Sequence, residues 1–179
     1  MLPSGRARWA LVAAALAVTL AACGSSTSDA GGEAPQPAGP VPSKIATMVC
    51  RPKAQAEINQ ALGVTATVTT KTWVDHKYSC PYVYPDGHFV LSVKELSSWP
   101  QTLSYYHSLG HQLGVTRSLP NLGQGAYQTT DGSVVVRKDW KVLLVDVAGL
   151  PAQFGKPPTG SGDVAVTVAV VILGCWAGD

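Results

Sequence analysis

Histidine and serine side chains are the first candidates for chemistry in this 179-residue chain. His107 and His111 are four residues apart, so on a helix they share one face, a spacing that suits a metal ion. The sequence offers no evident third ligand, and Gly110 stands between them. Ser161 lies between two glycines, but this also suits the start of a helix, and no GxSxG sequence is present. We therefore predict no catalytic residue, no metal site and no cofactor.

The composition argues against two classes of protein, an intrinsically disordered chain and a nucleic-acid-binding protein. Charged residues make up 13% of the chain and hydrophobic residues 46%, which is typical of a folded protein. The formal net charge of +2 includes Arg6 and Arg8 near the start, and without them 11 basic and 11 acidic side chains balance. We therefore expect no nucleic-acid partner.

Residues 1–22 have the composition of an export leader. Two arginines precede an apolar run of 14 residues that ends at Ala22, which is short for a bilayer span. The sequence Leu20-Ala21-Ala22-Cys23 follows and resembles the lipobox of bacterial lipoproteins. The resemblance implies cleavage before Cys23 and a diacylglyceryl group on its sulfur, which would anchor the protein to the outer face of the cytoplasmic membrane. A plain signal peptide with a coincidental cysteine, or an uncleaved anchor, is the alternative.

The segment after Cys23 is polar. Of the 19 residues of Gly24–Pro42, 14 are Gly, Ser, Pro or Ala, too few apolar groups for a core. The sequence therefore predicts a signal peptide over 1–22, a lipidated cysteine with a disordered tether over 23–43, and one globular domain over 44–179.

Three cysteines remain for the predicted domain. An exported protein resides where disulfides persist, and three cysteines allow one bridge. We favour Cys50–Cys80, which would join a helix start to a strand and close a loop of about 30 residues, worth about 3.5 kcal/mol. A Cys50–Cys175 bridge stays open as the alternative, and otherwise Cys175 is expected to be a small buried side chain.

The predicted domain has an α+β fold made of two similar halves. Each half is a helix followed by a meander, and together they predict an antiparallel sheet of five to six strands with three packed helices. The first half has a helix over Pro52–Leu62 and strands over 64–74, 78–84 and 88–94; the second has a helix over 99–113 and strands over 125–130, 133–138 and 140–148. The second set of strands is apolar on both faces, so we expect layers on both sides.

The last segment, Asp163–Trp176, fits two structures. Its valines alternate as in a strand, yet Ala165, Val168, Ala169 and Ile172 form a helical stripe after a capping sequence. We predict the third helix here, with a strand as the alternative.

Aromatic residues offer a possible binding surface. Tyr82 and Tyr84 share one face of their predicted strand, and Trp73 lies on the neighbouring strand. These three are the candidate ligand-facing residues, because such a stripe can stack on a glycan or line a groove. The alternative, which we favour, is that the stripe packs in the core under the second helix, against Tyr105 and Tyr106.

Several short motifs between Met48 and Trp176 resemble a class of small actinobacterial cell-envelope lipoproteins whose domain has no assigned function. They are Cys50, Ala61-Leu62-Gly63, Cys80-Pro81-Tyr82 and Leu122-Gly123-x-x-Ala126, with a Val-rich strand pair and a terminal helix that contains Trp. The resemblance implies a lipidated extracytoplasmic domain with one disulfide and no assigned catalysis.

Three functional readings remain open. We favour a membrane-anchored, non-catalytic module that binds an envelope protein, a glycan or another wall component. A carrier or sensor of a small or lipidic ligand, held between sheet and helices, is the second reading. An enzyme is the least favoured, because these residues assemble no activated nucleophile or acid–base pair.

Overall fold

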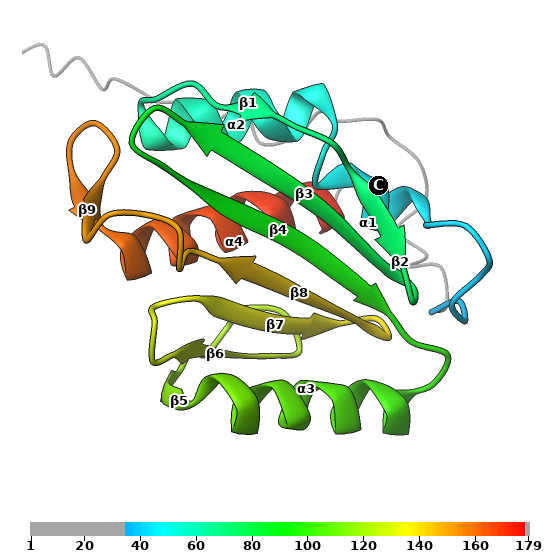
Figure 1. The fold of residues 1–179 in the computed structure, drawn as a ribbon. Coiled ribbons are helices and arrows are strands. Elements are labelled where there is room, and N and C mark those ends of the chain that lie inside the picture. Colours follow the sequence, from blue (N-terminus) through cyan, green and yellow to red (C-terminus); the bar gives the residue numbers. More distant parts are fainter. Residues whose placement is uncertain (1–34, 178–179) are drawn as a thin grey trace, which may run out of the picture.

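The computed structural model describes residues 35–177. The predicted signal peptide, Cys23 and the tether up to residue 34 lie outside the described residues. Within 35–177 the fold is α+β, with four helices and a mostly antiparallel sheet of eight strands (Figure 1). The helices are α1 (Lys44–Met48), α2 (Pro52–Leu62), α3 (Trp99–Leu113) and α4 (Ser161–Ala177). The strands are β1 (Thr67–Val68), β2 (Thr72–Val74), β3 (Lys77–Tyr84), β4 (Gly87–Glu95), β5 (Val115–Ser118), β6 (Gly125–Thr129), β7 (Val134–Lys138), β8 (Lys141–Asp146), β9 (Gln153–Phe154) and β10 (Thr159–Gly160).

The sheet joins the two predicted halves edge to edge. Its order is β1-β3-β4-β8-β7-β6-β5, with β2 also paired to β3, and β9 with β10 forms a separate ribbon. The junction is the antiparallel pair of β4 and β8, in which Val90 lies opposite Asp146 and Glu95 lies opposite Lys141. Strands from the two halves therefore share one continuous core.

Helices cover both faces of the second half, as the apolar pattern predicted. Because neighbouring side chains of a strand point to opposite faces, Val134 and Val136 pack in the cluster that contains α4, whereas Val135 packs with Tyr106 of α3. Figure 1 shows α2 and α4 behind the sheet and α3 below it, beside β5–β7. On the face opposite α4, α3 contacts β6, β7 and β8.

Local signals set the ends of α2 and α3. Pro52 opens α2, and Gly63 ends it in the left-handed conformation at φ 64°. A Cβ atom at Gly63 would lie 2.3 Å from the carbonyl oxygen of Lys156, so only glycine fits there. Ser98 caps α3 by accepting a hydrogen bond from the amide of Gln101. Both predicted helices are confirmed, and α3 runs through Gly110 without a break.

The terminal segment is a helix, which rules out the strand alternative. Val164, Ala165, Val168, Ala169 and Ile172 are at most 1% exposed and form its buried stripe. This stripe packs against α2 and against β7 and β8.

The numbers of strands and helices correct the expectation of five to six strands and three helices. The single strand predicted over 64–74 splits into β1 and β2, and β5 is an additional edge strand. The fourth helix is α1, a five-residue helix that Ser43 caps. Elements this short carry too few residues to show a periodic pattern.

Part of the predicted tether is bound to the domain. The amide of Ala38 donates to the carbonyl of Leu96, just beyond β4. Gly39 accepts a hydrogen bond from Nδ1 of His76, and Pro40 accepts one from Nε1 of Trp73. The ordered chain thus begins before residue 44, at the end of the sheet that holds the β2–β3 turn.

Candidate functional site

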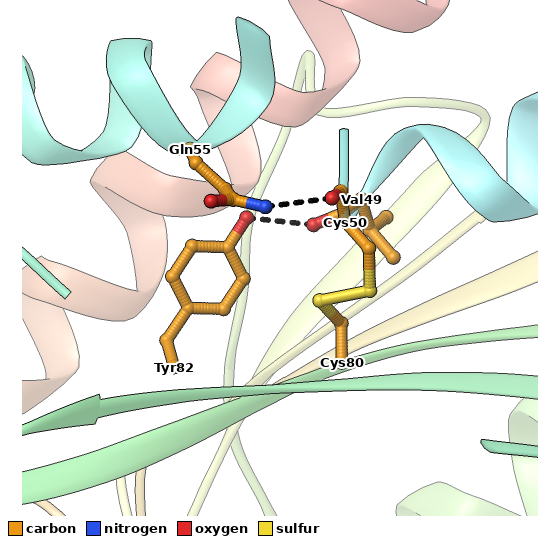
Figure 2. The surroundings of a disulfide bond; sticks show 5 residues. All are labelled: Val49, Cys50, Gln55, Cys80 and Tyr82. Atoms are coloured by element: carbon orange, nitrogen blue, oxygen red, sulfur yellow. Dashed lines mark hydrogen bonds between the residues drawn. A yellow bond between two sulfur atoms is a disulfide. The ribbon is translucent and has the colours of Figure 1, made fainter. Parts of the chain in front are cut away.

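The favoured disulfide, Cys50–Cys80, is present, with Cα atoms 5.7 Å apart and both cysteines at most 1% exposed. Two side chains secure the backbone beside it. Nε2 of Gln55 donates to the carbonyl of Cys50, and the Tyr82 hydroxyl donates to the carbonyl of Val49, each at 2.7 Å. Figure 2 shows both groups pointing at this turn between α1 and α2. The bridge therefore fixes the two N-terminal helices on β3, and the Cys50–Cys175 alternative is wrong.

Tyr82 and Tyr84 are core residues, which corrects the suggestion that they face a ligand. Tyr82 is 0% exposed and stacks on Phe89 with 4.8 Å between ring centroids. Tyr84 is 6% exposed and meets the edge of Phe154 at 4.8 Å. Burial raises the pKa of both phenols well above its usual value, so both stay neutral.

Tyr82 and Tyr84 were expected to pack under α3, but they lie on the opposite face of the sheet. Tyr82 contacts the α1–α2 side of the sheet, whereas Tyr106 packs with Tyr127 and Val135 on the opposite face. Core packing was the favoured reading and is confirmed, but the partner helix was wrong. Sequence alternation assigns residues to two faces without saying which helix covers which face.

Trp73 is half-buried and is the only one of the three candidates that keeps appreciable exposure. Its indole Nε1 donates to Pro40 at 3.1 Å, and its ring meets His76 in an edge-to-face contact with centroids 5.7 Å apart. The segment that leads into the domain therefore binds the indole N–H of Trp73, through the carbonyl of Pro40.

A first hollow lies between α3 and the β5–β6 edge of the sheet. It has a volume of about 310 Å³ and is lined by Tyr106, His107, Gly110, His111, Val115 and Tyr127. His107 and His111 share this face of α3, as their spacing predicted. Tyr127 donates its hydroxyl proton to the carbonyl of Tyr106 at 2.9 Å. Burial raises the pKa of Tyr127, and the neighbouring phenols raise it further.

Gly110 explains how Tyr127 fits beneath the helix. A Cβ atom at this position would lie 3.1 Å from Cγ2 of Val115 and 3.4 Å from the Tyr127 ring. The glycine is therefore a close-contact position between α3 and β6. No periodic signal in the sequence marks this role, because it depends on the approach of β6.

A second hollow lies beside α4 and was not predicted from the sequence. Its volume is about 400 Å³, and it is lined by Asn121, Leu122, Gly123, Lys138, Val170, Leu173 and Gly174. Val170 is 54% exposed there. Lys138 also lies 5.6 Å from the centroid of the Trp176 ring. The lining of the second hollow is thus mainly apolar and includes one cation, Lys138.

Ser161 is the first residue of α4, so the glycines around it mark a helix start. Within residues 35–177 no three side chains of His, Cys, Asp or Glu come together in a way that could hold a metal ion. In the same range, no helix combines the length and the apolar character needed to cross a bilayer.

Comparison with known proteins finds no match to this chain among family models, curated proteins or solved structures. The resemblance to actinobacterial envelope lipoproteins therefore stays a prediction that rests on the quoted motifs.

Proposed function

We propose that this protein is a membrane-anchored lipoprotein of the cell envelope and that its domain is a non-catalytic binding module. The observation that carries the proposal is Leu20-Ala21-Ala22-Cys23 directly after a short cationic and apolar leader. The Cys23 sulfur would carry the lipid, and the domain would lie on the outer face of the cytoplasmic membrane.

Two features of the domain support this location. A fully buried disulfide suits a compartment where disulfides persist. Fourteen residues separate Cys23 from Ala38, whose amide donates to the carbonyl of Leu96, so the length of the chain limits the distance between the proposed lipid and the domain to about 50 Å. That limit keeps the domain close to the membrane while leaving it free to meet a partner.

The binding role rests on what the domain surface offers. The first hollow is lined mainly by aromatic and histidine side chains and the second by aliphatic side chains and Lys138, and both provide contact area for recognition. Partners of this chemistry are an envelope protein, a glycan or a lipid.

Replacing Cys23 by alanine tests the anchor. The precursor is expressed in a bacterium that processes lipoproteins, and cells are fed an alkyne-tagged palmitate. We expect wild-type protein to carry the label and to sediment with membranes, and the Cys23→Ala protein to be unlabelled and released, because the acylated sulfur is gone.

Ser25→Ala is the matched control, since it changes the same segment and keeps the cysteine. It should behave as wild type. Equal membrane fractions for wild type and Cys23→Ala, or a wild-type protein without label, would contradict the anchor.

A second function, a carrier or sensor of a small ligand, is favoured by the hollow under α3. It lies between sheet and helix, where the sequence placed such a pocket, and two histidines border its aromatic lining. A small planar or weakly anionic molecule would stack on the tyrosines and accept hydrogen bonds from the imidazoles.

Native mass spectrometry of the purified protein tests the carrier function. We expect a co-purified molecule that is lost when His107→Ala and His111→Ala are combined and retained in Gln112→Ala, an exposed position on the same helix. A wild-type protein that carries no such molecule would exclude this second function.

A further inference from the structure

We infer that one end of the domain rests on the anionic surface of the membrane, through lysines and exposed apolar side chains that surround the entry of the chain. We call this the anchor end and define it by the β2–β3 turn, the end of β4 and the β7–β8 turn. The inference builds on the proposed lipid anchor and adds the orientation of the domain and the lipid chemistry that it meets.

The chain enters the domain at the anchor end. Ala38, Gly39 and Pro40 are hydrogen-bonded to Leu96, His76 and Trp73, respectively. Figure 1 shows this entering segment, in blue, beside the tip of β2 and far from β9. A lipid on Cys23 therefore holds the anchor end, and not the opposite end, nearest to the bilayer.

Five lysines lie at the anchor end: Lys44 opens α1, Lys77 opens β3, Lys94 is near the end of β4, and Lys138 and Lys141 flank the β7–β8 turn. Lys77 and Lys94 are direct cross-strand partners. Like charges directly opposite each other destabilise a sheet unless a counter-charge is near. Phosphate groups of a lipid surface would supply this charge.

The carboxylates of the anchor end, Asp75, Glu95 and Asp139, offset three of these five lysines and leave a net charge of +2. Asp139 lies 3.7 Å from Lys138, and the carboxylate of Glu95 is buried and accepts a hydrogen bond from Ser43. Asp75 is exposed, and the ammonium of Lys94 donates to its backbone carbonyl. Lys44 and Lys77 are exposed and project cationic charge.

The opposite end of the sheet carries the reverse sign. Four carboxylates lie there: Asp86, Asp131 and Asp146 at turns or strand ends, and Asp163 in the first turn of α4. Lys156 and Arg117 offset two of them. An anionic surface therefore attracts the anchor end and repels the other end, which leaves that end free for an envelope partner.

Exposed apolar side chains accompany the lysines. Val41 and Val74 are 70% and 61% exposed, the two most exposed large hydrophobic side chains among the described residues, and Trp99 is 37% exposed at the start of α3. Val74 lies opposite Lys77 in the β2–β3 pair, so the two share one face. Apolar groups beside lysines are the composition of a surface that lies in the interface of an anionic bilayer.

Amine labelling of the native lipidated protein in vesicles tests this orientation. The protein is reconstituted in phosphatidylcholine alone or in phosphatidylcholine with phosphatidylglycerol, and lysine labelling rates are read by peptide mass spectrometry. We expect Lys44 and Lys77 to be labelled about fivefold more slowly in the anionic vesicles, the factor for about 1 kcal/mol per lysine. Lys156, at the opposite end, should keep its rate, and high salt should remove the difference.

Charge reversal supplies the second comparison. Lys77→Glu should restore fast labelling of Lys44 in anionic vesicles, whereas Lys156→Glu should leave Lys44 protected; both positions are exposed, so both variants are expected to fold. Equal rates for Lys44, Lys77 and Lys156 in both kinds of vesicle would overturn the orientation. Intact mass reports acylation separately: a chain without lipid whose Lys44 and Lys77 are still protected on anionic vesicles overturns the anchor alone.

Discussion

Combined replacement of Cys50 and Cys80 by alanine will lower the free energy of unfolding by about 3.5 kcal/mol, because the unfolded chain regains the entropy of a loop with a sequence separation of 30 residues. The folded state also loses the link that holds α1 and α2 on β3. Folded domains are commonly stable by about 5–15 kcal/mol, so the loss is a large fraction of the total.

The measurement is denaturant unfolding followed by circular dichroism, with all chains carrying Cys23→Ala so that they are free of lipid. The matched control combines Arg51→Ala and Ser79→Ala, which alter the direct neighbours of the two cysteines and keep the bridge. A double-alanine protein within about 0.5 kcal/mol of its parent would show that the bridge contributes little.

Phe89→Ala will lower the free energy of unfolding by about 4 kcal/mol. Phe89 is 0% exposed, stacks on Tyr82 and contacts the Tyr84 ring with centroids 5.8 Å apart. Its removal leaves a cavity beneath two rings, and the Tyr82 ring cannot fill it because its hydroxyl is bonded to the backbone of Val49.

Val83→Ala is the control for this variant, since Val83 lies on the neighbouring strand and is 37% exposed. Its unfolding free energy should stay within about 0.5 kcal/mol of wild type. Equal losses for the two variants, read from the same denaturation curves, would place Phe89 outside the core and contradict the packing described above.

Sequence patterns predicted α2 and α3 well because their signals are local. Pro52, Gly63 and Ser98 act through their own backbone conformation or through a bond to a residue three positions away. The candidate pair His107 and His111 was placed on one face for the same reason, and the structure brings both to a hollow. Val115 of β5 and Tyr127 of β6 also line this hollow, and this was not predictable, because they reach it only through the pairing of strands in the sheet.

The ligand-facing candidates show where such patterns fail. Alternation placed Tyr82 and Tyr84 on one face of a strand, and this is confirmed by their shared packing on Phe89. Whether that face meets solvent or a helix depends on α1 and α2, which the disulfide holds there. The partial exposure of Trp73 likewise depends on Pro40, which is 33 residues away in the chain.

By itself the sequence determined the α+β class and the ends of two helices, since each depends on residue type and short spacing. It favoured the Cys50–Cys80 pair, but the two cysteines are 30 residues apart, and the tertiary structure decided between this pair and Cys50–Cys175. Only the tertiary structure decided that the last segment is a helix. Its sequence fits the spacing of a strand as well as that of a helix, and the helix is selected because α2, β7 and β8 bury one of its faces. The same holds for the pairing of β4 with β8 and for the gathering of lysines where the chain enters. These features join residues far apart in sequence, and no local spacing encodes which distant strands will meet.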